Sequence, residues 1–215
     1  GHRGGTQAVA FGTGGKMLFS GGQDGRVKVW DPASGRLVQT LGGFEGAVTS
    51  VGLRADGEWV AAGSEDGSVR VWEVTSWNEV QSFLAHANGT GGVAFRPDTS
   101  LVTGGADQKV KVWRAGADVP VAVLAGHEGM VTSVDVHPGG QWGVSGSEDG
   151  TVRVWDLQQN TAVWVGDPHR QPVQSVAFSA DGQAVSAGGW DEIVTVWSAA
   201  SGELLQRISA GETVG

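Results

Sequence analysis

The chain has 215 residues and a formal net charge of −9, with 14 Lys and Arg against 23 Asp and Glu and no run of basic residues. Nucleic acid is therefore not expected as a ligand, because binding to phosphates requires a positively charged surface. The chain has no cysteine, which excludes disulfides and thiolate sites. It also has no apolar stretch of about 18 residues and no signal-like start, and these two observations predict an intracellular, cytoplasmic or nuclear protein without membrane contact.

Short runs that alternate apolar and polar residues recur about every ten residues, and no window repeats apolar residues at the spacing of a helix. This pattern predicts an all-β chain in which most of the 37 glycines mark hairpin turns. In chain order, the predicted strands are 7–11, 16–20, 26–30 and 36–41; 47–53, 58–63, 68–72 and 79–84; 91–95, 101–103, 109–113 and 120–124; 131–136, 141–145, 151–155 and 162–165; and 173–178, 183–187, 193–197 and 204–208.

One sequence unit, a turn followed by a strand that ends in Trp, returns five times along the chain. Its clearest copy is GSEDGTVRVWDL, from Gly146 to Leu157, and the other copies begin at Gly21, Gly63, Gly104 and Gly188. The closing Trp residues are 42, 41, 42 and 42 residues apart, at Trp30, Trp72, Trp113, Trp155 and Trp197. This spacing predicts one continuous array of five repeats, at about residues 1–42, 43–84, 85–125, 126–167 and 168–210.

These five units resemble the WD40 repeat family, whose members repeat at intervals of about 40–45 residues, and the resemblance covers essentially the whole chain. It implies an all-β propeller built of four-stranded antiparallel blades. Five blades are expected in this chain, as part of a larger, seven-bladed propeller. In this family a His, a Ser or Thr, an Asp and a Trp form a buried hydrogen-bonded tetrad that ties each blade together.

The resemblance places the tetrad positions in every repeat at fixed distances from the Trp. In repeat two, Phe44 and Ala62 stand at the His and hydroxyl positions, and in repeat five Ala187 stands at the hydroxyl position. The complete tetrads implied are His2, Ser20, Asp24 and Trp30; His86, Thr103, Asp107 and Trp113; and His127, Ser145, Asp149 and Trp155. The partial tetrads are Asp66 and Trp72 in repeat two, and His169, Asp191 and Trp197 in repeat five.

A catalytic interpretation of the same residues is weaker than the structural one. Ser145, His127 and Asp149 are the residue types of a nucleophilic triad, but a triad occurs once, whereas this set occurs three times at the same register. Metal binding by the His residues is not expected either, because the repeat register puts them on separate blades. The glycine clusters contain no nucleotide-binding motif. No catalytic residue, metal or cofactor is predicted.

The resemblance also implies that partners dock on the face that carries the loop before the innermost strand and the turn after the second strand. The acidic residues there, beside Trp190, favour a basic or aromatic-rich segment of another protein, because Trp and Arg are the usual anchors of interfaces. The alternative is that these Glu residues only keep the surface soluble. Trp77, in a turn on the opposite face, is a second candidate for an exposed aromatic. The candidate partner-binding residues are Trp190, Arg170, Met130, Glu128, Glu148, Glu65, Glu45 and Arg3.

A non-enzymatic scaffold or adaptor module of a multiprotein complex is the function that these observations favour. The alternative is a targeting or regulatory propeller of a larger protein whose catalytic domain lies outside this chain. Five repeats leave three possibilities for the ring: a piece of a seven-bladed propeller, a closed five-bladed ring, or an open array completed by another chain. The start in repeat phase at His2 favours the first, and association through open end blades is then expected.

Overall fold

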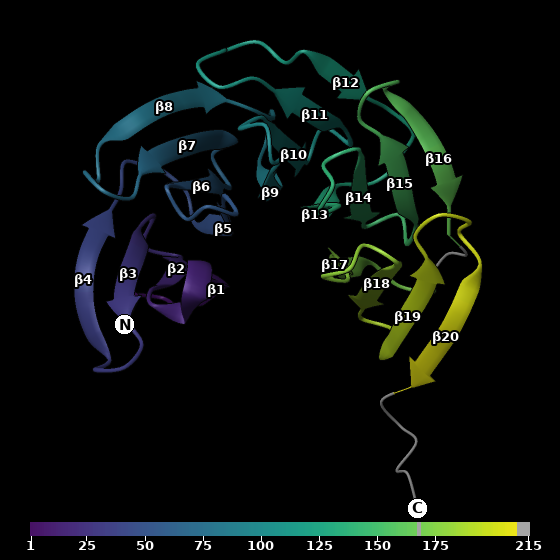
Figure 1. Cartoon of the computed structure of the whole chain (residues 1–215), viewed down its shortest axis with the longest axis horizontal. Helices are drawn as coiled ribbons and strands as arrows, with labels where there is room; N and C mark the ends of the chain where they lie inside the picture. Colours follow the sequence, from purple (N-terminus) through teal and green to yellow (C-terminus); the bar gives the residue numbers. More distant parts are fainter. Residues whose placement is uncertain (167–168, 210–215) are drawn as a thin grey trace, which may run out of the picture.

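The computed structural model describes residues 1–166 and 169–209. Within these residues the chain folds into five four-stranded antiparallel sheets, and consecutive strands are neighbours in every sheet. We number the sheets blades 1 to 5 in chain order. Figure 1 shows them as an arc around a common centre, with the first strand of each blade innermost and the fourth outermost. The all-β architecture of propeller blades expected from the sequence is confirmed.

Each blade is a meander of four strands joined by short turns. Blade 1 contains β1 (Thr6–Phe11), β2 (Leu18–Gly22), β3 (Val27–Asp31) and β4 (Arg36–Leu41), with a 3-10 helix, η1 (Thr13–Gly15), between the first two. Blade 2 contains β5 (Val48–Leu53), β6 (Trp59–Ser64), β7 (Ser68–Glu73) and β8 (Glu79–Leu84). Blade 3 contains β9 (Thr90–Phe95), β10 (Leu101–Gly105), β11 (Val110–Trp113) and β12 (Ala122–Leu124). Blade 4 contains β13 (Val131–Val136), β14 (Trp142–Ser147), β15 (Val152–Asp156) and β16 (Thr161–Val165), and blade 5 contains β17 (Val173–Phe178), β18 (Ala184–Gly189), β19 (Ile193–Ser198) and β20 (Leu204–Ser209).

The third strand of each blade shows why this sequence pattern forms a sheet. In β15, Val152 and Val154 are fully buried, whereas Arg153 between them is only partly buried, as expected when successive side chains point to opposite faces. The turn before β15 contains Gly150 at φ 81°, a backbone conformation that glycine adopts without steric cost.

The second strands extend further than the sequence predicted. β2 continues to Gly22, two residues beyond its predicted end, because Gly21 pairs with Ala8 and Gly22 with Thr6 in the ladder to β1. β10, β14 and β18 are longer by the same amount at this end. The sequence predicted turns at these glycines, and that prediction is wrong. At Gly21, Gly104 and Gly146 the innermost strand of the next blade packs too closely to admit a side chain, and at Gly22 and Gly105 the imidazole of the same blade does.

Four hydrophobic clusters, one between each pair of consecutive blades, hold the arc together. The cluster between blades 4 and 5, for example, joins Val152 and Val154 of β15 to Val173, Val185 and Trp197 of blade 5. The closing Trp residues of blades 2 to 5 are at most 3% exposed, because each packs against the preceding blade. The core of this protein is therefore a series of interfaces between sheets.

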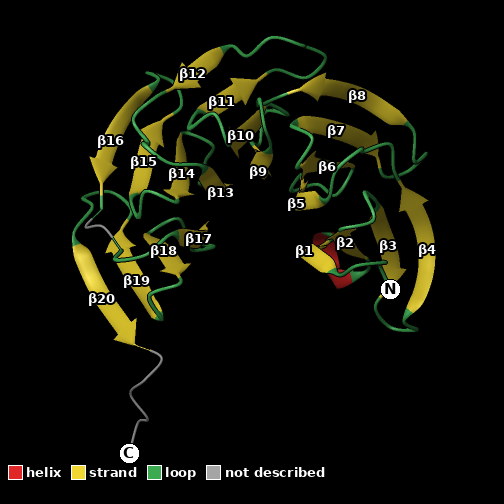
Figure 2. Cartoon of the chain, turned by 180° about the vertical axis from the view of Figure 1, so that it is seen from behind, coloured by secondary structure: helices red, strands yellow, loops and turns green. Residues whose placement is uncertain are grey.

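The arc does not close into a ring. Figures 1 and 2 show blades 1 and 5 on either side of an opening, and no strand of blade 1 is hydrogen-bonded to a strand of blade 5 among the described residues. A closed five-bladed ring, one of the three arrangements considered from the sequence, is not the arrangement observed. The innermost strands β1, β5, β9, β13 and β17 surround an open central cavity of about 560 Å³. In the described part of the chain, no helix has the length and apolar character needed to cross a membrane.

Candidate functional site

Three blades contain the full hydrogen-bonded set of His, hydroxyl, Asp and Trp. In blade 3, Trp113 Nε1–H donates to Thr103 Oγ1 at 2.8 Å, and His86 is bonded to the same oxygen at 2.7 Å and to Asp107 at 2.7 Å. The corresponding bonds join His2, Ser20, Asp24 and Trp30 in blade 1 and His127, Ser145, Asp149 and Trp155 in blade 4. Each set links the loop before the innermost strand to the turn after the second strand.

The protonation state of the imidazoles follows from these bonds. A carboxylate only accepts, so His Nδ1 carries the proton, and Nε2 accepts from the hydroxyl. Burial lowers the pKa of His86 and His127, against the effect of their Asp partners, which keeps both rings neutral. Burial acts to raise the pKa of Asp149, but hydrogen bonds from Thr151, Glu128 N–H and His127 outweigh it and lower that pKa to about 2. His86, His127 and Asp149 are therefore each held in one protonation state at neutral pH.

These sets do not suit nucleophilic catalysis. The Ser145 and Thr103 side chains are fully buried, and each hydroxyl oxygen is already bonded to an indole and to an imidazole. A substrate cannot reach the oxygen without opening the blade. What the arrangement does is to satisfy polar groups that the loop would otherwise bury without partners.

In blade 2, the set is replaced by aromatic packing. The Phe44 ring meets Trp72 edge to face, with 5.9 Å between ring centroids, and the guanidinium of Arg70 lies 5.4 Å from the centroid of Phe44. The Asp66 carboxylate keeps hydrogen bonds from Glu45 N–H at 2.8 Å and from Ser68 N–H at 2.8 Å. The loop is thus held by a cation–π contact and by backbone hydrogen bonds instead of an imidazole.

Blade 5 recovers its missing hydroxyl from another strand. Ala187 stands at the hydroxyl position of β18, and the residue paired with it on β19 is Thr195. Thr195 Oγ1 lies 2.7 Å from His169 Nε2, and His169 Nδ1 lies 2.9 Å from Asp191. Repeat five lacks the hydroxyl at the tetrad position, as the sequence indicated, but its imidazole still has a hydroxyl partner, which the sequence did not predict. The other blades carry Lys or Arg at the position of Thr195, at Lys28, Arg70, Lys111 and Arg153.

One face of the arc carries an exposed aromatic beside a cavity. Trp190 is 70% exposed and lines a cavity of about 380 Å³ together with Met130, Glu65 and Glu148. The same cavity is lined by Gln7, Thr49, Gly91, Thr132 and Gln174, which also line the central cavity, so the two are continuous. Four of the eight candidate partner-binding residues are thereby brought together. We call Trp190, Met130, Glu65 and Glu148 the Trp190 site.

Five segments of the chain match a known protein family. A family described as WD domain, G-beta repeat, matches the chain five times, over residues 1–31, 35–73, 77–114, 118–156 and 161–198. The chain belongs to the WD40 repeat family. WD40 repeats generally mediate protein–protein interactions as scaffolds, and proteins of the family are typically non-enzymatic. No curated protein matches the chain.

The WD40 matches are out of phase with the blades. The match over residues 35–73 begins just before β4, the outermost strand of blade 1, and ends with β7, the third strand of blade 2. The next three matches, at 77–114, 118–156 and 161–198, likewise begin at or a few residues before the fourth strand of one blade and end at or just after the third strand of the next. Each of these four WD40 units therefore spans the interface between two blades.

The remaining partner-binding candidates of the WD40 array lie outside the Trp190 site. Arg3, Glu45, Glu128 and Arg170 each follow the His or Phe position directly, and their backbone N–H groups donate to the turn Asp at 2.8 to 3.2 Å. Their side chains are exposed. They surround the tetrad loops but do not line the cavity, so their backbone has a structural role and their side chains remain available.

Trp77 is not the exposed aromatic that the sequence suggested. Its ring is partly buried and packs against Phe19 of blade 1, with 6.4 Å between ring centroids. The reason is that its turn, in which Trp77 has φ 60°, folds back over the cluster between blades 1 and 2. Trp77 is a packing residue and is no longer a docking candidate.

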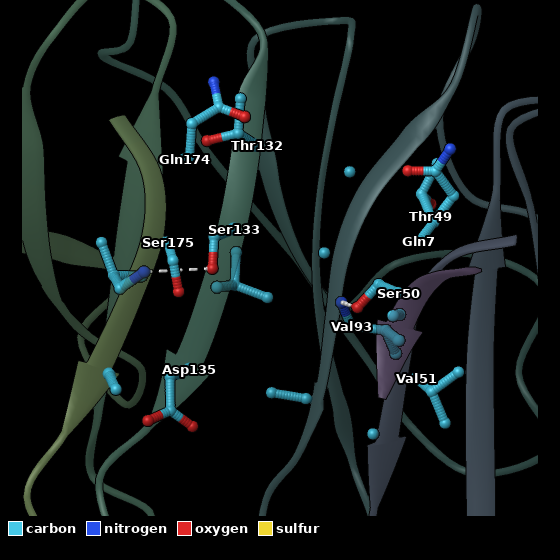
Figure 3. A pocket seen from close by; sticks show the side chains of 18 of the residues that line it. Gln7, Thr49, Ser50, Val51, Val93, Thr132, Ser133, Asp135, Gln174 and Ser175 are labelled. Atoms are coloured by element: carbon cyan, nitrogen blue, oxygen red, sulfur yellow. Dashed lines mark hydrogen bonds between the residues drawn. The ribbon is translucent and has the colours of Figure 1, made fainter. Parts of the chain in front are cut away.

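The polar residues of the innermost strands were missed by sequence reasoning. Figure 3 shows Thr49, Ser50, Thr132, Ser133 and Asp135 along the walls of the central cavity. Burial raises the pKa of Asp135, although N–H groups of Phe178 and Val136 donate to it. The signal was present in the segments VTSV and VQSV, where two polar residues separate the two valines. Which residues of the innermost strand face the central cavity depends on how consecutive blades pack around the arc, and the sequence of a single repeat does not show this packing.

Proposed function

We propose that this chain is a non-catalytic adaptor that binds an extended segment of another protein at the Trp190 site, with a Lys or Arg side chain of that segment as the anchor. The observation that carries the proposal is Trp190 itself, which is 70% exposed at the edge of a cavity with two carboxylates in its lining. A large ring held in water at a turn contributes little to folding, whereas Trp is one of the residue types enriched among the anchors of protein interfaces.

The charge of the site supports a basic ligand. Glu65 and Glu148 are exposed and neither forms an ion pair with any described residue. A Lys or Arg head can reach these carboxylates while its aliphatic stem lies on Met130 and its cation faces the Trp190 ring. The net charge of −9 adds a long-range attraction for a basic segment.

The walls that lead inward from the site suit a peptide backbone. The one hydroxyl proton of Thr49 is shared between the carbonyls of Thr90 and Gly63, and that of Thr132 between those of Val173 and Gly146. The oxygen of each hydroxyl is left able to accept. Gln7 and Gln174 are exposed and add both donors and acceptors. A segment whose anchor lies on Trp190 can therefore hydrogen-bond along the entrance to the central cavity.

A random-peptide display library tests the proposal directly. Peptides selected on the wild-type chain are expected to carry Lys or Arg, and Trp190→Ala is expected to weaken their binding by about tenfold or more while leaving the melting temperature unchanged. Glu148→Lys is expected to weaken binding, and the remaining affinity should depend less on salt. Leu205→Ala and Glu203→Lys, two exposed residues outside the site, are the matched controls. Selected peptides without basic residues, or equal losses in the controls, would contradict the proposal.

A further inference from the structure

A second, smaller cavity opens on the face opposite the Trp190 site. The innermost strands begin on the face of the Trp190 site and end on the opposite face, where a cavity of about 200 Å³ lies among the ends of β5, β9 and β13 and the turns that follow them. Leu53, Phe95 and Asp135 line both this cavity and the central one, so the two are continuous. Its walls come from blades 2, 3 and 4, each of which is flanked by another blade on both sides. We call it the Asp135 cavity.

Asp135 is the one charged residue at its level of the innermost strands. Three of the equivalent residues also line the central cavity, and all four are small. Figure 3 shows Asp135 at the opposite end of β13 from Thr132, which lines the cavity of the Trp190 site. The carboxylate therefore lies beside space that small side chains leave open, and it is nearest to the face opposite the Trp190 site. The equivalent residues are Ala10, Gly52, Ala94 and Ala177.

The Asp135 carboxylate has no cation beside it. Its oxygens accept from Val136 N–H and from Phe178 N–H of the next blade, each at 2.8 Å, whereas an ionised carboxylate offers about four acceptor sites. None of the described Lys, Arg or His residues forms an ion pair with it. Burial of a negative charge without a counter-charge is costly, which raises the pKa of Asp135. A cation bound to the carboxylate offsets part of this cost.

The two other ionisable side chains of the cavity are engaged elsewhere. Arg96 Nε donates to a backbone carbonyl of blade 4 at 3.0 Å, and the guanidinium forms an ion pair with Asp98 at 3.3 Å. His137 Nδ1 accepts from Gly139 N–H at 2.9 Å, so this nitrogen carries no proton. Neither side chain therefore provides the counter-charge of Asp135.

The size and the walls of the cavity suit one long side chain. Its volume of about 200 Å³ is below the lower limit of about 300 Å³ that is usual for cavities that bind drug-sized molecules. Leu53, Phe95 and Val136 supply partly buried apolar walls, and Pro97 and Pro138 form an exposed rim. The aliphatic stem of a Lys or Arg can lie against such walls while its charged head reaches a carboxylate.

We propose that the Asp135 cavity binds a Lys or Arg side chain of another protein, which enters from the face opposite the Trp190 site and places its charged head on the Asp135 carboxylate. The stem packs on Leu53 and Phe95. The carboxylate keeps its two backbone N–H donors and accepts from the cation at its remaining acceptor sites. The chain then has one site for a basic residue at each end of its central cavity, and this second site does not depend on the first.

Two small cations test the proposal on the whole chain. n-Butylammonium and propylguanidinium carry the charged ends of Lys and Arg, and n-butanol is the uncharged control. Each is titrated into the isotope-labelled chain while the backbone amide signals of Val136 and Phe178, the donors to the carboxylate, are followed by NMR. Both signals are expected to shift with the cations and to shift little with n-butanol. Millimolar dissociation constants are expected, because ligands with so few atoms gain little free energy on binding.

Three variants separate this site from the Trp190 site. Asp135→Asn removes the negative charge and is expected to raise the dissociation constant of both cations about tenfold or more. Ala55→Lys places a positive charge at the exposed rim and should raise it severalfold, with a smaller effect at high salt. Trp190→Ala, the control on the other face, should leave it unchanged, whatever its effect on selected peptides.

Three outcomes would overturn the proposal. The first is that neither cation shifts the amide signals of Val136 and Phe178. The second is that n-butanol binds as tightly as n-butylammonium, which would show that only the apolar walls contribute. The third is that Asp135→Asn and Ala55→Lys both bind the cations with wild-type affinity. Ala55→Lys changes an exposed side chain, so it gives an answer even if Asp135→Asn does not fold.

Discussion

At the scale of single residues, the sets of His, hydroxyl, Asp and Trp are chains of hydrogen bonds in which each group donates to the next. In blade 4, Trp155 Nε1–H donates a hydrogen bond to Ser145 Oγ, Ser145 O–H donates to His127 Nε2, and His127 Nδ1–H donates to Asp149. The Asp also accepts from Glu128 N–H at 2.8 Å. Removal of one member therefore leaves a buried partner without a bond, and the cost depends on whether water can replace it.

Comparison of Asp149→Ala with Asp66→Ala tests this account. Asp149→Ala is expected to lower the free energy of unfolding by about 2–4 kcal/mol, because the carboxylate accepts from His127 Nδ1, from Thr151 Oγ1 and from the N–H groups of Glu128 and Thr151. Asp66→Ala should cost less, because the groups that it releases, Glu45 N–H and Ser68, lie where water can reach them. Urea denaturation of both variants measures the difference, and a larger loss for Asp66→Ala would contradict the assignment of roles.

The pH dependence of stability should have two windows. In the folded chain the pKa values of His86 and His127 lie below their ordinary value of 6.5. As the pH falls through 6.5, these two residues therefore bind protons more readily in the unfolded chain than in the folded one, and the free energy of unfolding decreases. The folded pKa of Asp149 is about 2, against an ordinary 3.8, so its contribution is complete above pH 3.8 and is lost towards pH 2. That contribution is about 2 kcal/mol.

Urea denaturation between about pH 7 and pH 5 isolates the first window. The free energy of unfolding of the wild type should decrease across it, and the decrease should be smaller in His127→Gln, because one of the titrating groups is gone. A wild-type stability that stays constant across this range, or an unchanged slope in the variant, would show that the rings are not held neutral.

The residue scale also shows what the sequence could predict. The register of His, Asp and Trp follows from spacing alone, since each turn Asp precedes its Trp by the same number of residues. Thr195 could not be identified in this way, because its role depends on the pairing between β18 and β19. The burial of Trp77 depends on contact with Phe19, far away in the sequence. Local patterns show what a residue can do, but not which neighbour it meets.

At the scale of strands, blade 5 shows that the hydroxyl bonded to the His can come from the third strand of a blade instead of the second. The hydroxyl of β18 and the basic residue of β19 have been replaced together by Ala187 and Thr195. Because the two residues face each other in the ladder, the oxygen still reaches His169 Nε2 at 2.7 Å. The sequence predicted the strands themselves well, since their period of two is a local property, but it placed the glycines of the second strands in turns.

A double-mutant cycle tests the exchange. Thr195→Val should lower the free energy of unfolding by about 1–3 kcal/mol, because the buried His169 loses its partner. Ala187→Ser in that background should recover most of the loss, since the new hydroxyl stands where Ser145 stands in blade 4. Thermal or urea denaturation of the four proteins gives the coupling energy. Additive effects of the two substitutions would show that Thr195 does not replace the missing hydroxyl.

At the scale of the whole molecule, stability is a property of neighbouring pairs of blades. Blades 2, 3 and 4 each contribute to two hydrophobic clusters, whereas blades 1 and 5 contribute to one. The number of blades followed from counting repeats. The open arc and the cavity beside Trp190 did not, because both depend on how each sheet is turned relative to the next. The candidate residues of that site came from register and family resemblance, and the structure adds which of them share a cavity.

Amide hydrogen exchange of the dilute chain should reveal this arrangement. Amides in β9, β10 and β11 are expected to exchange more slowly than the corresponding amides in β1 to β3 and β17 to β19, because the end blades can open after the loss of a single interface. Mass spectrometry of peptides from each blade measures the order. Equal protection in all five blades would mean that the arc unfolds only as one unit.

The phase of the WD40 units bears on how such a gene can change. Each unit from 35–73 onward starts in one blade and ends in the next, so a duplicated or deleted unit exchanges three strands of one blade and the outer strand of its neighbour at once. Every sheet in the product still has four strands, because each unit carries four consecutive strands. A lineage can therefore lengthen or shorten its array by recombination between units, without passing through an ancestor that carries a broken blade.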